Sequence, residues 1–349
     1  MTRASHVTVR AGFLLTAFFL LVRTGLAEED TRVDRATDKG LEYLARIQNS
    51  DGSWSYGSSP VKHSAVTSLA VLAFLAKGHT PGEGRYGDLI NKGIDWVLGT
   101  SNAQTGLISE NGSYWGSMYS HGTSTLMLAE AVGMTTGKRE QKMREVLERA
   151  VKLTLQAQKV TRKEPLQQGG WRYTHVSVDS DISVTGWQLM SLRAAKNAGA
   201  DVPLAAINDA VGYIKRSASG GGGFGYMGPS GTNRARAGTG ILALELCGQH
   251  NTPEALAAAE WLMRNPPAWP DEFFYYAVYY CSQGMFQMGD KYSEFYRPRL
   301  EALLLGLQRD DGSWPTYEGN DGQAGPAYTT SMAVLALSVK YHYLPIYQR

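Results

Sequence analysis

Residues Lys39–Trp54 read KGLEYLARIQNSDGSW, a helical pattern that ends at a glutamine and is followed by a glycine turn and a tryptophan. The DGSW turn returns near the other end of the chain, at Asp311–Trp314. There too a leucine-rich helical pattern precedes the turn and ends at Gln308. Self-similarity of this kind is the sequence signature of repeat architectures, in which each repeat is one small packing unit. The stretch therefore predicts a chain built from helical repeats.

Further copies of the pattern lie between these two ends. Gln158 precedes Gly169–Trp171 in one copy, and Gly222–Phe224 forms the turn of another. Weaker copies begin at Gly93 and Ala259. A second helical pattern follows each copy, and it usually opens at a small polar residue and continues with apolar and small residues. Its openings are Thr67, Thr123, Thr185, Thr239, Tyr276 and Thr330.

Each repeat thus consists of a helix, a turn and a second helix. The second helices are apolar on nearly every side, which predicts burial, and the first helices are amphipathic, which predicts one solvent-facing side. The repeats span roughly 36–80, 90–133, 146–197, 207–248, 257–288 and 296–340. An open solenoid needs polar capping repeats at its ends, whereas here the first and last copies match best. We therefore predict an all-α fold, an (α/α)6 toroid of six helical hairpins, as one domain over 28–349.

Residues 1–27 resemble a secretory signal peptide. Arg3 and Arg10 precede the apolar run Ala11–Val22, and Gly25 and Ala27 occupy the −3 and −1 positions of a small-residue cleavage site. The run is 12 residues long, against roughly 20 needed to span a bilayer. The segment therefore predicts a cleaved signal and a secreted or periplasmic protein without a stable transmembrane anchor.

Composition and charge exclude several classes of protein. With 43% hydrophobic and 19% charged residues among 349, the chain is not of the disordered kind. Removing residues 1–27 takes three of the 34 basic residues and no acidic one, which leaves 31 against 32 and changes the net charge from +2 to −1. A nucleic-acid partner needs a concentrated basic face, so none is expected. The ligand is expected to be a small molecule or a polymer.

The repeat resembles a known one. Lys39–Trp54 is similar, position by position, to the QW repeat of squalene and hopene cyclases, and the copy ending at Trp314 matches its second half. The same repeat superfamily includes the β subunits of protein prenyltransferases and thioester-bearing complement-type domains. The resemblance covers residues 36 to about 338 and implies the same α/α toroid. Within the motif, we expect the glutamine to bond helix-terminal groups and the buried tryptophan to fix the turn.

The catalytic motif that the resemblance implies is incomplete. Such cyclases protonate an alkene with an Asp-x-Asp-Asp-Thr motif, and Asp179–Thr185 is the nearest segment. An alignment on Thr185 places Asp181 at the first acid, with Ser183 and Val184 at the two later ones. A shift by two residues also loses the last acid. In addition, these cyclases normally have a second helical domain, which the 322 residues after the expected signal peptide are too few to supply.

The metal and thioester motifs of the related families are also missing. Prenyltransferases bind zinc through Asp-x-Cys and a later histidine, and the nearest match is Glu245–Cys247 with His250. Positions 245 and 247 point about 200° apart on a helix, so we expect no metal and no cofactor. The complement-type domain needs Cys-Gly-Glu-Gln, whereas Cys247–His250 reads CGQH. The sequence does not decide whether Cys247 and Cys281 form a disulfide.

In a toroid the starts of the inner helices converge on one mouth, which yields a set of candidate site residues. The catalytic candidates are Asp181, His121 and Glu272. The cavity-lining candidates are His63, Tyr119, Ser183, Arg236, Phe274, Tyr276 and Tyr328. Asp181 could instead cap its helix, and the histidines could be hydrogen-bonded loop residues. The aromatic run Phe273–Tyr280 fits either core packing or an aromatic pocket wall.

Three functions fit these features. The first is a secreted protein of the prenyltransferase and squalene-cyclase repeat type, whose cavity binds an apolar or extended ligand, isoprenoid by resemblance. The second is a carbohydrate-active lyase or hydrolase, for which Asp181 and Glu272 would be the paired carboxylates. The third is a non-catalytic interaction scaffold. The sequence leaves the choice and the presence of catalysis open.

Overall fold

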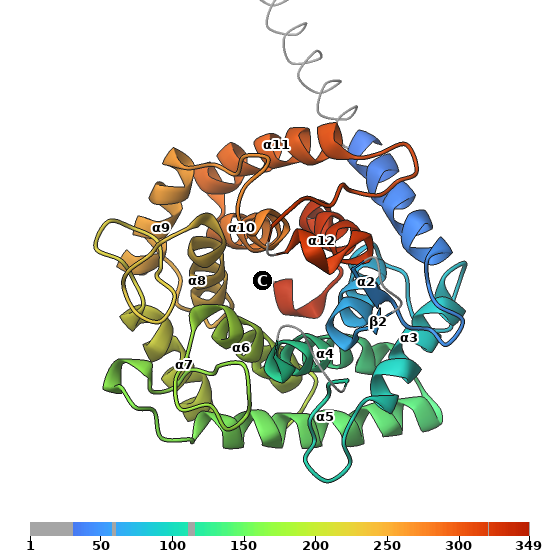
Figure 1. Cartoon of the computed structure of the whole chain (residues 1–349), viewed down its shortest axis with the longest axis horizontal. Coiled ribbons are helices and arrows are strands. Elements are labelled where there is room, and N and C mark those ends of the chain that lie inside the picture. The colour runs from blue at the N-terminus through green and yellow to red at the C-terminus, as the bar shows by residue number, and fades with distance from the viewer. Residues whose placement is uncertain (1–30, 58–60, 111–115, 320, 349) are drawn as a thin grey trace, which may run out of the picture.

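The computed structural model describes residues 31–57, 61–110, 116–319 and 321–348, so the expected signal peptide lies outside the described residues. The described helices form two concentric rings, one inside the other (Figure 1). The predicted all-α fold, an (α/α)6 toroid, is confirmed. Hairpin follows hairpin around the ring, and α12 packs against α2 to close it.

Outer and inner helices alternate along the chain. The outer helices are residues 31–46, α3 (Gly87–Gly99), α5 (Gly137–Gln158), α7 (Leu204–Arg216), α9 (Pro253–Arg264) and α11 (Asp290–Leu307). The inner helices are α2 (Ser64–Ala76), α4 (Ser117–Ala131), α6 (Ile182–Asn197), α8 (Arg234–Leu246), α10 (Phe274–Met288) and α12 (Pro326–Leu337). A two-stranded antiparallel hairpin, β1 (Ser55–Tyr56) and β2 (Val61–Lys62), precedes α2, and short 3-10 turns occupy some connections.

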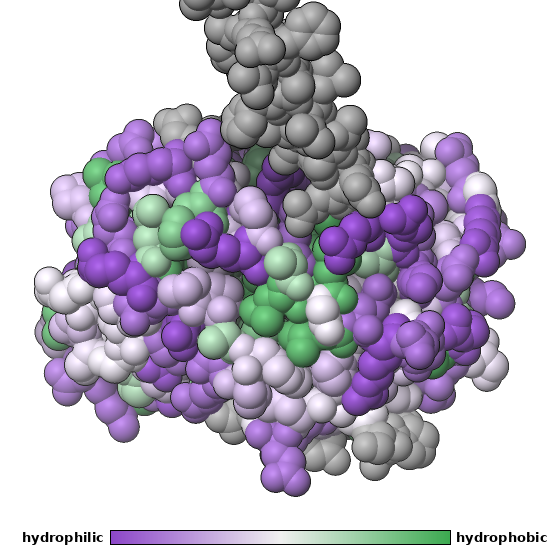
Figure 2. All heavy atoms as spheres, turned by 90° about the horizontal axis from the view of Figure 1, so that it is seen from above, coloured by the Kyte–Doolittle hydropathy of each residue, from purple (hydrophilic) through white to green (hydrophobic). Residues whose placement is uncertain are grey.

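Burial separates the two rings as the hydrophobic patterns predict. Every residue of α2 is buried, because this helix packs on all sides. The outer helix α7 buries only one stripe, which includes Ile207, Val211 and Ile214. Seen from its edge in Figure 2, the outer surface is mainly hydrophilic, with an apolar area near the middle of the view. The inner ring therefore forms most of the core.

The glutamine of each complete motif joins one repeat to the next. The Gln48 Nε2 donates to the carbonyl oxygen of Gly52 in its own turn, at 3.0 Å, and to that of Leu89 in α3, at 2.9 Å. The Gln308 Nε2 does the same with Gly312 and, across the closure of the ring, with Ala36 at 2.8 Å. The motif thus stabilises the stacking of repeats as well as the turn.

The tryptophan of the motif fixes the turn between the two helices of its own repeat. The Trp54 Nε1 donates to the Leu44 carbonyl near the end of the outer helix, at 2.9 Å. The Trp54 backbone N–H donates to the Thr67 Oγ1 of the inner helix, also at 2.9 Å. Trp171 and Trp314 make equivalent pairs of bonds. The recurring threonine that opens the second pattern therefore serves as the acceptor for the turn.

The C-terminal segment enters the middle of the ring (Figure 1). The short helical turn η5 (Pro345–Tyr347) follows α12 and packs against α6. The Ile346 N–H donates to the Glu130 Oε2 near the end of α4, and the Gln287 Nε2 donates to the Tyr347 carbonyl from the end of α10. This segment, Pro345–Tyr347, therefore closes the ring at the end where these inner helices finish, and we call it the plug.

Candidate functional site

A cavity of about 690 Å³ opens at the opposite end, where the inner helices begin. Aromatic side chains make up eight of its eighteen lining residues, and six of these are tyrosines. Its lining consists of Tyr56, Leu69, Gly116, Tyr119, Thr123, Tyr173, Ser183, Trp187, Tyr226, Asn233, Ala235, Arg236, Glu272, Phe273, Tyr276, Asp321, Gln323 and Tyr328. The volume falls within the range of small-molecule sites.

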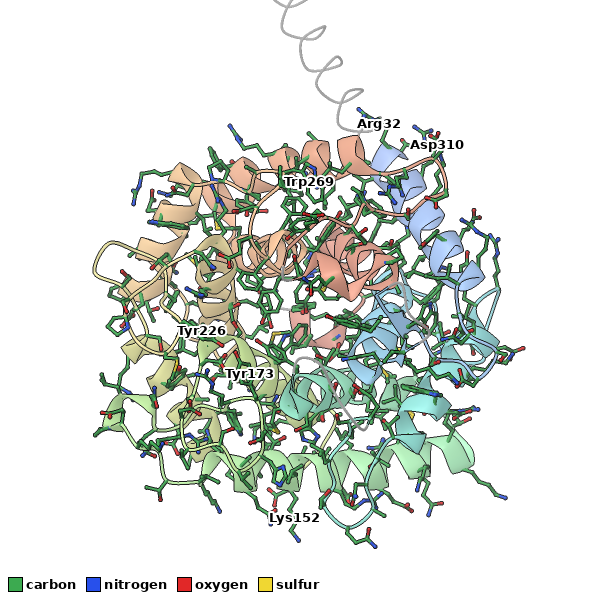
Figure 3. The ribbon with its side chains drawn as sticks, in the orientation of Figure 1. Arg32, Lys152, Tyr173, Tyr226, Trp269 and Asp310 are labelled. Carbon is green, nitrogen blue, oxygen red and sulfur yellow. The ribbon has the colours of Figure 1, made fainter. Side chains whose placement is uncertain are left out.

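One wall is a stack of tyrosine and arginine side chains. Tyr173 and Tyr226 come from the connections that precede α6 and α8, and Figure 3 shows them close together beside the centre of the ring. Their hydroxyl groups are hydrogen-bonded to each other. The Arg172 guanidinium lies 4.7 Å from the Tyr173 ring centroid and 5.4 Å from that of Tyr226. The Arg236 guanidinium lies 4.9 Å from the Tyr226 centroid. These contacts hold the rings in fixed orientations.

Deeper in the cavity the lining is an indole ring supported by the aromatic core. The Trp187 ring stacks on that of Tyr279, with centroids 5.7 Å apart and an interplanar angle of 9°. The Tyr279 hydroxyl bonds that of Tyr347 in the plug. Tyr276, beside Trp187, donates from its hydroxyl to the Ser183 carbonyl at 3.4 Å. The plug therefore supports the floor of the cavity through Tyr279.

Two carboxylates reach the lining. Glu272 lies on the connection that enters α10 and is exposed. Asp321 is buried, and its Oδ2 accepts a hydrogen bond from the Tyr276 N–H at 3.0 Å. Burial raises the pKa of Asp321, against its hydrogen bonds, which lower it. The Tyr317 hydroxyl contacts Asp321 and lies 2.9 Å from the carbonyl oxygen of Asp271, so it links the two acidic segments.

Next to Glu272 the backbone adopts a conformation that non-glycine residues rarely take. Phe273 has φ 56° and ψ 40°, the left-handed region. Such a residue costs about 1–2 kcal/mol, and strain of this kind concentrates at functional sites. The conformation sends the chain from the cavity wall directly into α10.

Six of the ten residues selected from the sequence lie on this cavity. They are Tyr119, Ser183, Arg236, Glu272, Tyr276 and Tyr328. The other four are buried outside the lining, and the physical reason differs in each case.

Asp181 is the N-cap of α6. It is fully buried, its backbone is extended, and its Oδ1 accepts a hydrogen bond from the Val184 N–H at 2.9 Å. Its Oδ2 receives no hydrogen bond from a described group and lies 3.9 Å from the Arg172 Nε. Burial raises the pKa of Asp181 to about 7, while the Val184 N–H and Arg172 lower it. Asp181 thus has the capping position that the sequence offered as an alternative, and its carboxyl group does not line the cavity.

His121 faces the outer ring instead of the cavity. Its Nδ1 accepts a hydrogen bond from the Ile108 N–H at 3.2 Å, and its Nε2 lies 3.0 Å from the Thr154 Oγ1 on α5. Burial lowers the pKa of His121 to about 4. The expected place at the mouth is therefore wrong, because one ring nitrogen bonds the connection that precedes α4 and the other bonds α5.

His63 and Phe274 lie behind the lining. His63 is fully buried, its ring stacks 5.4 Å from that of Tyr56, and its Nε2 lies 3.3 Å from the Glu110 Oε1. Phe274 is fully buried, with its ring 4.9 Å from that of Trp269. Both were expected in the cavity, but His63 lies behind Tyr56 and Phe274 packs toward the outer side.

The sequence reasoning missed half of the aromatic lining, namely Tyr56, Tyr173, Trp187 and Tyr226. Trp187 follows Ser183 by four positions and Thr123 follows Tyr119 by four, so helical spacing could have found them. Tyr56 ends the strand β1, and Tyr173 and Tyr226 lie on connections between helices. Only the folded chain brings these connections together.

No metal or membrane feature appears in the parts of the chain that the structure describes. No three His, Cys, Asp or Glu side chains gather there as a metal site. The Glu245 Oε2 lies 2.7 Å from the His250 Nδ1, and Cys247 and Cys281 are free thiols. None of the described helices is long and apolar enough to cross a membrane.

Comparison with known proteins finds similarity of structure only. No protein-family model and no curated protein matches the chain. The alpha-1,6-mannanase GH76A of Salegentibacter sp. HEL1_6 superposes with a TM-score of 0.67 at 11% identity, over 89% of this chain and 99% of that one. The type II terpene cyclase MstE from Scytonema superposes with a TM-score of 0.58 at 16% identity, over 90% and 99%.

Variants of both proteins have been solved with ligands. One mannanase variant, with a TM-score of 0.65 at 11% identity over 89% and 99%, holds alpha-1,6-mannotriose. One cyclase variant, with a TM-score of 0.58 at 16% identity over 92% and 99%, holds geranylgeranyl dihydroxybenzoate. These similarities show the fold class alone: the chain is an (α/α)6 toroid. Because that fold serves both chemistries, the lining must decide between them.

Proposed function

We propose that the cavity binds an oligosaccharide and that the chain acts on a glycosidic bond within it. The observation that carries this proposal is the lining itself, six tyrosines and a tryptophan among polar side chains. A sugar ring offers an apolar face that packs on aromatic rings and hydroxyl groups that need hydrogen-bond partners. Tyrosine and tryptophan supply both kinds of contact.

Charged groups in the cavity favour this ligand over a hydrocarbon. Arg236, Glu272 and Asp321 all reach the lining. A hydrocarbon chain would remove water from these groups without replacing its hydrogen bonds, which is costly. A polyhydroxylated ligand replaces those bonds.

The two carboxylates supply the chemistry of the proposed reaction. Glycoside cleavage uses one carboxyl group as the acid that protonates the leaving oxygen and a second carboxylate as base or nucleophile. We assign the acid role to Asp321, whose pKa is raised by burial, and the second role to Glu272, which is exposed on the wall. The pair differs from the Asp181 and Glu272 pair expected from the sequence.

Tryptophan fluorescence of the mature chain tests binding. We would titrate alpha-1,6-mannotriose, other neutral and acidic trisaccharides, and a geranylgeranyl compound. At least one trisaccharide is expected to change the emission, and the Trp187→Phe variant is expected to lose that change because Trp187 is the tryptophan among the described lining residues. Binding of the geranylgeranyl compound alone would overturn the proposal.

Release of reducing ends tests the reaction. Glu272→Gln is expected to abolish cleavage of a bound oligosaccharide and to change its affinity little, since the substitution preserves shape. Glu294→Gln is the matched control, because Glu294 lies on the outer helix α11 and not on the lining. Binding without any cleavage by the wild type would remove the enzymatic half of the proposal and favour the interaction scaffold.

One observation favours proton-initiated terpenoid cyclisation as a second candidate. Asp181 is a buried carboxyl group with its pKa raised to about 7, at the start of an inner helix. It is close enough to Tyr119 and Tyr276 of the lining to influence their ionisation. Turnover of a geranylgeranyl substrate that disappears in Asp181→Asn would establish this candidate. Turnover that persists in Asp181→Asn would exclude Asp181 as the acid.

A further inference from the structure

One cation of the cavity wall has no acidic partner among the residues that the structure describes. Arg236 lines the cavity, and its Nη1 donates to the Gly231 carbonyl. No carboxylate of the described residues is within ion-pair distance of it. Arg234, two positions earlier, pairs with Asp271 at 2.7 Å. Arg236 is therefore the unpaired member of two neighbouring arginines.

Arg236 occupies a helix position that disfavours a cation. It lies in the first turn of α8, which contains no acidic residue. The positive end of the helix dipole disfavours cations there and favours anions. A second guanidinium, that of Arg172, lies on the same Tyr226 ring at 5.4 Å, although Asp179 pairs with it at 3.5 Å. An anion bound beside Arg236 would interact favourably with this end of α8.

Neighbouring side chains are arranged to complete an anion site. The Asn233 Oδ1 accepts a hydrogen bond from the Arg236 N–H at 2.9 Å, which leaves the amide NH₂ of Asn233 as a donor on the same wall. The Tyr226 ring fixes the guanidinium plane through its face. An arginine fork held in this way matches the two oxygens of a carboxylate or sulfate group.

We propose that Arg236, with Asn233 and Tyr226, forms an anion subsite of the cavity, and that the ligand bound there is an acidic oligosaccharide carrying a carboxylate or sulfate group. This inference rests on the proposed carbohydrate function and makes its substrate class specific. Asp321, the buried acid of the lining, belongs to another part of the wall. It lies on the segment before α12, two inner helices away from α8 around the ring, and its Oδ2 accepts a hydrogen bond from the Tyr276 N–H.

Calorimetric titration of the mature chain tests the subsite. The probes are a trigalacturonate, the neutral galactose trimer of the same linkage, and a sulfated galactose trimer. The wild type is expected to bind at least one acidic trimer on the order of tenfold more tightly than the neutral one, as charge-assisted hydrogen bonds provide. This preference should shrink as salt is added.

Matched variants separate a local contact from a general charge effect. Arg236→Gln is expected to reduce binding of the acidic trimer to the level of the neutral one, and Arg236→Lys to retain part of the preference. Lys152→Gln makes the same change of charge on the outer face of α5 (Figure 3) and should leave the preference intact. Thermal unfolding of each variant verifies that it is folded.

The outcomes separate failure of the anion subsite from failure of the proposed carbohydrate function. Equal wild-type affinity for acidic and neutral trimers, or an equal loss of both in Arg236→Gln, would overturn the anion subsite and leave the carbohydrate site standing. Failure of these trimers, of alpha-1,6-mannotriose and of the other trisaccharides to bind would overturn both. The two acidic probes identify which oxyanion the subsite takes.

Discussion

At the scale of single residues, Asp181 combines full burial with a structural role. Its Oδ1 caps α6, whereas its Oδ2 has no hydrogen-bond donor among the described groups. An ionised carboxylate in such a place is costly. Burial accordingly raises the pKa of Asp181 to about 7, so the folded protein holds a proton that the unfolded chain releases at lower pH.

This predicts that the free energy of unfolding falls as pH rises from about 4 to about 7. In that window the folded state binds more protons than the unfolded state, and above it the loss is complete. Asp181→Asn keeps a capping side chain, so the stability loss across this pH range, on the order of 4 kcal/mol, should disappear in the variant. Urea unfolding at several pH values measures it. Asp201→Asn, an exposed control, should leave the slope unchanged, and a slope also unchanged in Asp181→Asn would contradict the prediction.

His121 provides a second residue-scale prediction. Because its ring nitrogens join Ile108 to Thr154 on the outer side of α4, His121→Ala should lower the free energy of unfolding by roughly 3 kcal/mol. Ligand affinity of the folded variant should stay at the wild-type value. A selective loss of ligand affinity at unchanged stability would place His121 back in the site.

At the scale of elements, one glycine per turn permits the repeats to stack. Gly52, Gly169 and Gly312 have φ near +90°, and a Cβ at each would lie within 2.4 Å of a carbonyl oxygen of the next outer helix. Only glycine combines this conformation with so close an approach. For Gly312 the next outer helix is the first one, through Lys39, so the contact that stacks the repeats also closes the ring.

We therefore expect Gly312→Ala to be severe. The Cβ would lie 2.3 Å from the Lys39 carbonyl oxygen, and the combined clash and strain should cost about 3 kcal/mol or more. Gly84→Ala is the matched control, because Gly84 also has a positive φ but nothing within 4 Å of the added Cβ. It should cost only about 1 kcal/mol. Thermal and chemical unfolding compare the two, and equal losses would mean that the close approach does not matter.

At the scale of the whole molecule, the C-terminal plug closes one end of the ring, and the cavity opens at the other end. Ile346 and Tyr347 are buried, and the Tyr347 hydroxyl reaches Tyr279, whose ring supports Trp187. Glu130, which accepts the Ile346 N–H at 3.2 Å, is also buried. Burial raises the pKa of Glu130 to about 8.

The plug is therefore expected to weaken as pH rises from about 4.5 to about 8, since Glu130 must lose its proton inside the ring. Glu130→Gln should flatten the stability profile in this window by several kcal/mol, on the order of 4. Hydrogen exchange of the Ile346 amide should accelerate with pH more steeply in the wild type than in the variant. Identical behaviour of the two proteins would show that the plug does not depend on this carboxyl group.

The sequence by itself determined the ring. The Gln48, Gly52 and Trp54 pattern reports contacts made within a repeat or with its neighbour, so each copy contains its own evidence. The hydrophobic patterns likewise separated inner from outer helices, because the spacing of apolar residues along a helix indicates which of its faces is buried. Six of the ten candidate residues also reached the cavity, because the inner helices all begin at the same end.

Only the tertiary structure decided which way the remaining side chains face and what lies between the helices. The inner helices begin at different distances before the aligned threonine: Asp181 caps α6 four residues before Thr185, whereas Tyr119, four before Thr123, is already inside α4. Side chains at the same number of residues before the aligned threonine therefore point in different directions. Tyr173 and Tyr226 meet only through loops of adjacent repeats, and the plug closes the ring from the far end of the chain. Contacts between segments so distant in sequence leave no local pattern, and they form the walls and floor of the cavity.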